Sequence, residues 1–395
     1  MSQTPLKAAA ASSSAPSDSE EEHVGVDANT AMFLKLFLDK TSPTPSFHPD
    51  MTHQVFGIQE SIIGYENPII TLCLNGSNMH CYYDFSFDKE EEEHTDVHSS
   101  LTTVLSPDED CLPVYTSFPA FEASFDSNST CPFLQYTKEV ASYTHKDQEF
   151  IITSCSIAQT VELWPYHKRI ESLMFFYIDE FSTIDLDDPD WVCFYVLRRE
   201  RTNDNDFRHS FVGAMTAYKF FKYPDSFLLR LSQVFIIPPF RRLGLASKLL
   251  SVLYGHATSM GASQVIVESP SDDLVMVRDL YDCSLLKSNG FKIQDFEKEV
   301  YPHCQKFEEI SKKLCISVDQ IRRCCELLRF CVLVSSGRSE GKDMEELRKT
   351  VKKRYFANNY SSFLAMTEDE RKEKLQSMFE GDLYFYNELI KVIQL

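Results

Sequence analysis

The sequence lacks the features that mark metal-binding, secreted and membrane proteins. Its 12 cysteines are scattered along 395 residues without a CxxC pair, and it contains no HExxH motif and no paired Cys/His spacing, so we predict no metal site. No apolar run approaches the ~18 residues that a membrane-spanning helix needs. The first residues also lack the apolar stretch of ~7 to 15 residues of a secretory signal. We therefore expect reduced cysteines, no membrane partner, and a location in the nucleus and cytoplasm.

Positive charge is scarce as well. The 39 Lys and Arg residues face 59 Asp and Glu residues, which gives a net charge of -20. Residues 306–395 hold 17 basic and 15 acidic residues, so the acidic excess lies in residues 1–305. Two acidic clusters, 88–96 and 106–110, are either solvated loops or a dock for a basic ligand. Such a chain is not expected to bind nucleic acid directly and favours polycationic partners.

Composition and periodicity divide the chain into four parts. Residues 1–27 are rich in Ala, Ser and Glu without periodic apolar positions, which predicts a disordered acidic tail. Residues 28–148 contain short apolar and aromatic stretches separated by turns, as in a small α+β domain. Residues 149–292 alternate strand-like and helix-like runs, and residues 293–395 have the apolar spacing of helices. The predicted fold class is α+β.

Within the third part, several segments have clear strand or helix patterns. Residues 230–237 follow residues 211–223 across a Pro-Asp turn, which predicts an antiparallel pair. Residues 164–176 have the spacing of an amphipathic helix. The other predicted strands are 149–157, 191–200 and 264–268.

A compact loop between a strand and a helix is the most informative segment. The strand VFII, residues 234–237, ends at two prolines, and a helix with one apolar stripe runs from about Leu245 to Gly261. The start of a helix presents unpaired backbone N–H groups, and Gly244, one of only 12 glycines, lets a ligand approach the backbone. Arg241 and Arg242 add two cations. The loop therefore predicts pyrophosphate binding, and the alternative is an ordinary strand-to-helix connection with solvated arginines.

The pattern Arg-x-x-Gly-x-Ala at residues 241–246 resembles the coenzyme A pyrophosphate loop of the GCN5-related N-acetyltransferase superfamily. The resemblance implies that residues 149–292 form an acetyl-CoA-binding domain with a mixed, mostly antiparallel sheet flanked by helices. Backbone amides of residues 235–237 are then expected to pair with the pantetheine arm and polarise the thioester carbonyl, or else to serve sheet pairing alone. The implied cofactor positions are Val234, Phe235, Ile236, Arg241, Arg242, Leu243, Gly244, Leu245, Ala246, Ser247, Ser271 and Arg278, with a surface ion pair as the alternative for Arg278.

The chain further resembles the family of type B histone acetyltransferase catalytic subunits. The resemblance implies acetyl transfer from acetyl-CoA to tail lysines of newly made histone H4, in complex with a WD40 histone chaperone. It extends through a helical segment, 314–330, into the last part of the chain. The matching segments occur in order at residues 27–36, 52–65, 177–196, 212–225, 230–250 and 267–279.

Lysine acetylation needs a base, because a free lysine amine with a pKa of about 10.4 is almost wholly protonated at neutral pH. Glu268 matches the catalytic glutamate of the family, and Asp179 matches a second acidic position. Asp179 and Glu180 are alternatively a charge pair at a helix end. Ser269 stands where the family commonly has an aspartate, so a third carboxylate is missing. No cysteine has a partnered histidine, which favours direct transfer in a ternary complex.

Two short segments occupy the positions at which the family binds the histone tail. They are Ile58, Gln59 and Glu60, and Tyr218, Lys219 and Phe220. Glu60 is alternatively a solvated turn residue, and Tyr218 and Phe220 are alternatively packed on a sheet face. Two rival functions stay open: an acetyltransferase for other amines, and an acidic histone-binding chaperone without catalysis, suggested by the charge and by Ser269.

Overall fold

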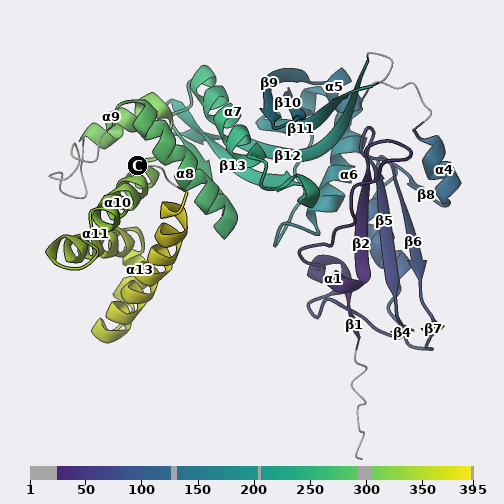
Figure 1. Cartoon of the computed structure of the whole chain (residues 1–395), viewed down its shortest axis with the longest axis horizontal. Helices are drawn as coiled ribbons and strands as arrows, with labels where there is room; N and C mark the ends of the chain where they lie inside the picture. Colours follow the sequence, from purple (N-terminus) through teal and green to yellow (C-terminus); the bar gives the residue numbers. More distant parts are fainter. Residues whose placement is uncertain (1–24, 126–130, 203–205, 292–304, 393–395) are drawn as a thin grey trace, which may run out of the picture.

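The structure is a computed structural model that describes residues 25–125, 131–202, 206–291 and 305–392. Figure 1 shows three parts side by side along the longest axis: a sheet from the N-terminal part at one end, a second sheet in the middle, and helices of the C-terminal part at the other end. In the described residues no helix is long and apolar enough to cross a membrane. In the same residues no group of three metal-ligating side chains comes together.

The N-terminal part is built on a four-stranded sheet in the order β2-β5-β6-β8. Its inward residues, such as Leu34, Leu72 and Cys81, are fully buried. Val26 and Asp27, which the sequence placed in the tail, pair with Ile62 and Ser61 in a short strand; residues 1–24 of the predicted tail lie outside the described residues. The elements are β1 (Val26–Asp27), α1 (Ala28–Ala31), β2 (Met32–Phe37), α2 (His53–Phe56), β3 (Ser61–Ile62), β4 (Tyr65–Glu66), β5 (Ile69–Asn75), β6 (Cys81–Ser86), β7 (Lys89–Glu90), α3 (Val97–Leu105), β8 (Val114–Tyr115), α4 (Phe118–Ala123) and α5 (Pro132–Gln135).

The middle part is a six-stranded sheet in the order β14-β13-β12-β11-β10-β9. All neighbouring strands are antiparallel except β13 and β14, which are parallel. The strands and the helix predicted between residues 149 and 237 are confirmed, as is the glycine at the end of α7, where Gly261 has φ +75°. The elements are β9 (Lys138–His145), β10 (Gln148–Ser156), η1 (Ile157–Gln159), η2 (Val161–Leu163), α6 (Trp164–Met174), β11 (Trp191–Arg201), β12 (Phe207–Lys222), β13 (Ser226–Ile236), η3 (Pro238–Phe240), α7 (Leu245–Met260) and β14 (Val265–Val267).

The boundary predicted after residue 148 is wrong, because it divides the hairpin of β9 and β10. Eight residues of β9 belong to the six-stranded sheet, which therefore begins at Lys138. β9 is an edge strand, and its sequence KEVASYTH alternates exposed and half-buried positions without an apolar run. A strand with so few apolar residues carries little of the signal that distinguishes a strand from a loop.

Helix α6 fastens the N-terminal part to the middle sheet. The Arg169 guanidinium is buried and donates to the carbonyl oxygens of Leu105 (2.9 Å) and Leu112. Leu105 is the last residue of α3, so a buried cation meets the negative end of a helix dipole. The Ser172 hydroxyl donates to the Val104 carbonyl at 2.7 Å. Both parts also share one continuous apolar core.

The C-terminal part consists of helices that pack on the β14 edge of the middle sheet. The Val265 amide of β14 donates to the Cys315 carbonyl at 2.6 Å, so a segment of this part extends the sheet. The predicted helical character of this part and the α+β class are confirmed; residues 292–304, with the predicted boundary after 292, lie outside the described residues. The helices are α8 (Asp272–Ser288), α9 (Gln305–Leu314), α10 (Val318–Ser335), α11 (Lys342–Asn358), α12 (Tyr360–Leu364) and α13 (Glu368–Ile390).

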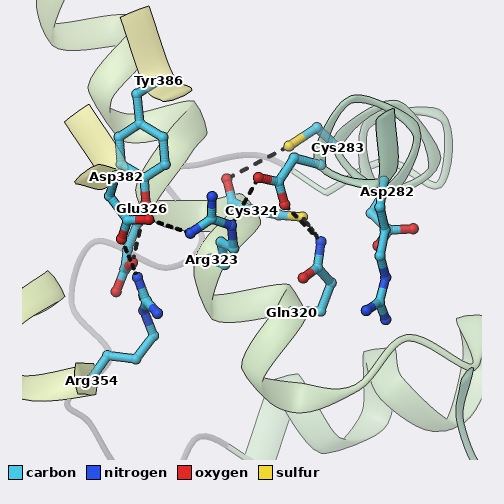
Figure 2. A network of polar contacts seen from close by, with 11 residues as sticks. Asp282, Cys283, Gln320, Arg323, Cys324, Glu326, Arg354, Asp382 and Tyr386 are labelled. Carbon is cyan, nitrogen blue, oxygen red and sulfur yellow. Dashed lines mark hydrogen bonds and ion pairs between the residues drawn. The ribbon is translucent and has the colours of Figure 1, made fainter. Parts of the chain in front are cut away.

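A buried ion-pair network joins four of these helices (Figure 2). Arg323 of α10 donates through Nε to Asp279 of α8 at 2.8 Å and through Nη1 to Asp382 of α13. Arg354 of α11 donates through Nη2 to the other oxygen of Asp382 at 2.7 Å and through Nε to Glu326 of α10 at 2.8 Å. Each charged group has a partner of opposite sign, which a buried charge requires.

We predict that Arg354→Ala lowers the free energy of unfolding by about 3 to 5 kcal/mol, because it leaves the buried Glu326 without its cation and takes one of two cations from the buried Asp382. The exposed pair of Lys349 and Glu345 on the same helix, at 3.6 Å, offers a control. Lys349→Ala should cost only about 0 to 1 kcal/mol. Urea unfolding of both variants measures the difference, and equal losses would contradict a structural role of the network.

Candidate functional site

A β-bulge in β13 opens the middle sheet. The pairs Thr216–Gln233 and Ala217–Leu231 leave Ser232 without a partner on β12, so β13 has one extra residue at that point. β14 pairs with β13 only from Leu229 to Leu231 and ends there. From Ser232 onward, β13 therefore keeps β12 on one side, and no strand among the described residues pairs with its other side.

The bulge also decides which backbone amides face the opening. Ile237 donates its N–H to Val212 of β12 at 3.0 Å, and because successive amides of a strand point to opposite sides, that of Phe235 faces β12 too. The amides of Val234 and Ile236 face the side on which β14 has ended. The expectation that the amides of residues 235–237 line the opening is thus corrected: Val234 and Ile236 do so, and Ile237 is used in sheet pairing.

Glu268 stands at the start of this opening. It follows β14 directly, and its backbone N–H donates to the Leu231 carbonyl at 3.0 Å. Its carboxylate receives the Arg230 guanidinium at 2.8 Å and is 42% exposed. Arg230 in turn lies over the Phe220 ring at 4.4 Å. The next residue, Ser269, has φ +32°, so the chain turns sharply away after the carboxylate.

The loop at residues 241–244 leads into a helix at Gly244 as predicted, but one of its two arginines, Arg241, is engaged by an acidic side chain. Gly244 has φ +80° and is the N-cap of α7, and its carbonyl accepts the first helical bond from Lys248. Arg242 is 83% exposed and lies 3.7 Å from Asp273. Arg241 forms a bidentate ion pair with Asp50 of the N-terminal part, with N–O distances of 2.8 and 3.3 Å. The charge of Arg241 is therefore largely neutralised by Asp50.

The other expected cofactor positions divide into two groups. Leu245, Ala246 and Ser247 form the first turn of α7, where backbone N–H groups lack helical partners. Ser271 caps α8 by accepting the Leu274 amide at 3.4 Å. Arg278 is nearly buried, donates to the Val265 carbonyl at 3.1 Å and pairs with a buried carboxylate at 3.3 Å, so its contacts are internal rather than those of a surface ion pair.

A histidine that the sequence did not single out connects two of the expected acids. His53 Nε2 lies 3.3 Å from Asp179 Oδ1, and His53 Nδ1 lies 3.8 Å from Glu60 Oε1. Glu60 also accepts the backbone amides of Thr52 and His53 and the side-chain amide of Asn29. Hydrogen bonds, chiefly from the Thr52 amide, lower the pKa of Glu60. The Glu60 carboxylate is thus fixed by hydrogen bonds rather than solvated in a turn. Asp179 lies beyond the end of α6 at Met174, so it is not part of a charge pair at that helix end.

The remaining expected substrate positions lie at two surfaces. Ile58 is 91% exposed and Gln59 is exposed beside it. Tyr218 and Phe220 share one face of β12 with ring centroids 4.6 Å apart. The Tyr218 hydroxyl donates to Asp188 at 2.9 Å, and this hydrogen bond raises the pKa of Tyr218. Lys219, on the opposite face of the strand, lies 3.9 Å from Asp190. The surface at residues 58–60 and the surface at residues 218–220 therefore each place exposed side chains beside carboxylates.

Sequence reasoning missed Asp50, His53, Arg230 and also Tyr143, whose hydroxyl donates to the Leu243 carbonyl at 2.9 Å. Each acts through a contact with a segment far away in the chain or on a neighbouring strand, so no local spacing marks it. The available signal was the matched segments: His53 lies in 52–65, Asp50 lies just before it, and Arg230 begins 230–250.

Glu171 fixes the segment that carries Asp179. Its carboxylate is buried, accepts the Ile184 amide at 2.8 Å and lies 3.7 Å from His167 Nε2. Burial raises the pKa of Glu171 to about 7 and lowers the pKa of His167 to about 4. The two groups therefore form a neutral pair at mildly acidic pH.

We predict that ionisation of Glu171 destabilises the protein above neutral pH. Because its folded-state pKa lies above the ordinary value of 4.5, the folded protein holds a proton that the unfolded chain has lost, and the contribution of Glu171 to stability falls as pH rises from about 4.5 to about 7. The lowered pKa of His167 acts in the opposite direction, so the comparison with a variant of Glu171 is needed to isolate the contribution of Glu171. The free energy of unfolding of Glu171→Gln, taken relative to that of the wild type, should rise by about 1 to 3 kcal/mol when the pH is raised from 5 to 8. Urea unfolding at both pH values tests this, with exposed Glu162→Gln as the control. A constant difference at the two pH values would contradict it.

Comparison with known proteins places these features in context. Residues 24–179 match the family model described as "Histone acetyl transferase HAT1 N-terminus". A type B histone acetyltransferase catalytic subunit of Dictyostelium discoideum is 27% identical over 338 residues, which cover 81% of this chain and 69% of the relative. Its counterpart in Schizosaccharomyces pombe is 26% identical over 378 residues, which cover 92% of each chain. These relatives extend through the middle and C-terminal parts.

Among solved structures, an aminoglycoside N-acetyltransferase in complex with CoA is 16% identical, covers 41% of this chain and 99% of that chain, and has a TM-score of 0.22.

Proposed function

The chain belongs to the type B histone acetyltransferase catalytic subunits, and from this premise we propose that it transfers the acetyl group of acetyl-CoA directly to tail lysines of newly made histone H4. Its middle part has the GCN5-related N-acetyltransferase fold. The observation that carries the proposal is the meeting of Glu268 with the open side of β13, where β14 ends. An acid beside backbone donors is the arrangement that acyl transfer to an amine needs.

Glu268 is proposed to act as the general base. Acetyl-CoA supplies the acetyl group as a thioester. The lysine nitrogen attacks the carbonyl carbon, the C–N bond forms, the C–S bond breaks, and CoA leaves as a thiolate that takes up a proton from solvent. The attacking nitrogen must first lose a proton, and a carboxylate at the start of the opening is placed to take it. The ion pair with Arg230 holds this carboxylate in position. Because the residue after Glu268 is Ser269 and not a carboxylate, Asp179 is the proposed second acid, and His53 lies 3.3 Å from it.

The amides of Val234 and Ile236 are proposed to face the pantetheine arm and the thioester carbonyl. Backbone donors directed at a developing oxyanion are worth about 2.7 to 4 kcal/mol each. A covalent route through cysteine is disfavoured, because burial raises the pKa of Cys193 well above its usual range and Cys283 is buried as well. Direct attack within a ternary complex is the simpler route.

The loop at residues 241–247 is proposed to hold the pyrophosphate. The turn at Gly244 and the first-turn amides of α7 suit an anion without relying on net charge. Arg242 is the more exposed cation, while Arg241 shares its charge with Asp50. Arg278 and Ser271 have internal partners, so we leave them out of the proposed cofactor site.

A basic histone tail suits the charge of the chain. Acids at both proposed substrate surfaces, together with the net charge of -20, favour a lysine-rich peptide. We further propose that the chain works with a WD40 histone chaperone and is found in nucleus and cytoplasm. The rival function of a non-catalytic chaperone gains its support from Ser269.

Incubation of a core histone mixture with the protein and acetyl-CoA, followed by mass spectrometry, tests the function. We expect acetyl-lysine in the H4 tail, with little on a polyamine supplied at the same concentration. Histone binding without any acetylation would favour the chaperone, and faster acetylation of the polyamine would favour an enzyme for other amines.

We predict that Glu268→Gln lowers turnover on an H4 tail peptide by about 10² to 10⁴-fold while acetyl-CoA binding holds, because glutamine keeps the shape but cannot take the proton. Activity of the variant should recover steadily toward pH 10 as solution supplies deprotonated lysine. Glu180→Gln is the matched control. A Glu268→Gln enzyme within threefold of the wild type at pH 7.5 would make Asp179 the leading base.

A further inference from the structure

A tyrosine on the far edge of the sheet reaches the proposed pyrophosphate loop. The Tyr143 hydroxyl, on β9, donates to the Leu243 carbonyl at 2.9 Å. β9 and β13 are separated by three strands in the sheet, but α7 contacts both, so the start of α7 and its loop lie over β9. This contact joins residues 100 positions apart in the chain.

The hydrogen bond fixes the peptide plane between Leu243 and Gly244. In a trans peptide the carbonyl and the following N–H point in opposite directions. With the Leu243 carbonyl held by Tyr143, the Gly244 N–H is directed to the other side, away from the tyrosine. The loop then presents donors rather than a carbonyl oxygen, and a carbonyl oxygen would repel a phosphate.

The same hydroxyl explains why residue 244 is a glycine. A Cβ atom at position 244 would lie 2.7 Å from the Tyr143 hydroxyl oxygen, closer than atoms in contact allow. The positive φ of +80° also favours glycine. Tyr143 and Gly244 are therefore matched to each other: the space that a side chain would take at 244 is filled by the group that orients the loop.

The tyrosine ring is itself held in place. It stacks on Phe150 of β10, with centroids 6.5 Å apart and planes at 29°. Phe150 meets Phe240, which lies at the beginning of the loop, at 6.4 Å and 82°. Aromatic contacts thus connect the tyrosine to the beginning of the loop, and its hydroxyl reaches the end of the loop through the Leu243 carbonyl.

We propose that Tyr143 is a positioning residue for the cofactor, which orients the Leu243–Gly244 peptide so that the loop accepts the pyrophosphate of acetyl-CoA. The inference rests on the proposed function of this loop. Tyr143 touches no reacting atom, so its effect is expected on binding of the diphosphate end of the cofactor and not on the transfer step.

Tyr143→Phe keeps the ring and removes the hydroxyl, and with it the 2.9 Å hydrogen bond to the Leu243 carbonyl and a longer contact of 3.5 Å with His145 Nδ1. We expect the KM for acetyl-CoA to rise about three- to tenfold, the range that one neutral hydrogen bond supplies, with kcat unchanged. The KM for S-acetyl-pantetheine, which lacks the pyrophosphate, should stay the same. Tyr384→Phe, at an exposed position, is the matched control. A rise for both acetyl donors, or for neither, would overturn the assignment of Tyr143.

The kinetics of the wild type with the two acetyl donors test separately whether the loop binds the pyrophosphate at all. If it uses S-acetyl-pantetheine as well as acetyl-CoA, the pyrophosphate site itself is refuted and the role of Tyr143 with it. If the wild type prefers acetyl-CoA strongly and Tyr143→Phe does not change that preference, only the role of Tyr143 is refuted.

A second test uses the contact between the two residues. Gly244→Ala should raise the KM for acetyl-CoA in the wild-type background, because its Cβ meets the hydroxyl. In the Tyr143→Phe background the same substitution should have a smaller effect, since the obstructing oxygen is gone. Equal effects in both backgrounds would contradict the proposed match.

Discussion

One extra residue in β13 is the constraint on which the candidate site depends. Without the bulge at Ser232, the amides of Val234 and Ile236 would face β12 and would not be available to a ligand. With it, β14 ends after three residues, Glu268 stands where the strands part, and β13 continues into the loop before α7. Proposed base, backbone donors and pyrophosphate loop thus follow from one irregularity in a regular sheet.

The N-terminal part completes this site rather than standing beside it. Asp50 pairs with Arg241 of the loop, and His53 lies against Asp179. Gln54 exchanges two hydrogen bonds with the Phe181 backbone, at 2.9 and 3.0 Å. The segment between α6 and β11 is therefore held from both sides, by Gln54 and His53 outside and by Glu171 within. The same segment of the N-terminal part connects the proposed cofactor loop with the proposed second acid.

Local patterns predicted much of this architecture, and contacts between distant residues account for what they missed. The alternation in residues 191–236, the two prolines and Gly244 indicated the strands and the loop, because each feature acts within a few residues. β9 was missed since an edge strand with polar alternation resembles a loop. The bulge was missed because the pairing register of β13 depends on its partner β12. Likewise, Arg241 was expected to be free for an anion because nothing near it in sequence indicates Asp50.

Amide hydrogen exchange at single-residue resolution, with and without saturating acetyl-CoA, tests the central claim most directly. The opening predicts that the cofactor slows exchange at Val234 and Ile236 by at least about tenfold, as new hydrogen bonds protect them. Phe235 and Ile237, which already face β12, should change little. Equal slowing at all four residues, or no slowing at Val234 and Ile236, would contradict the account.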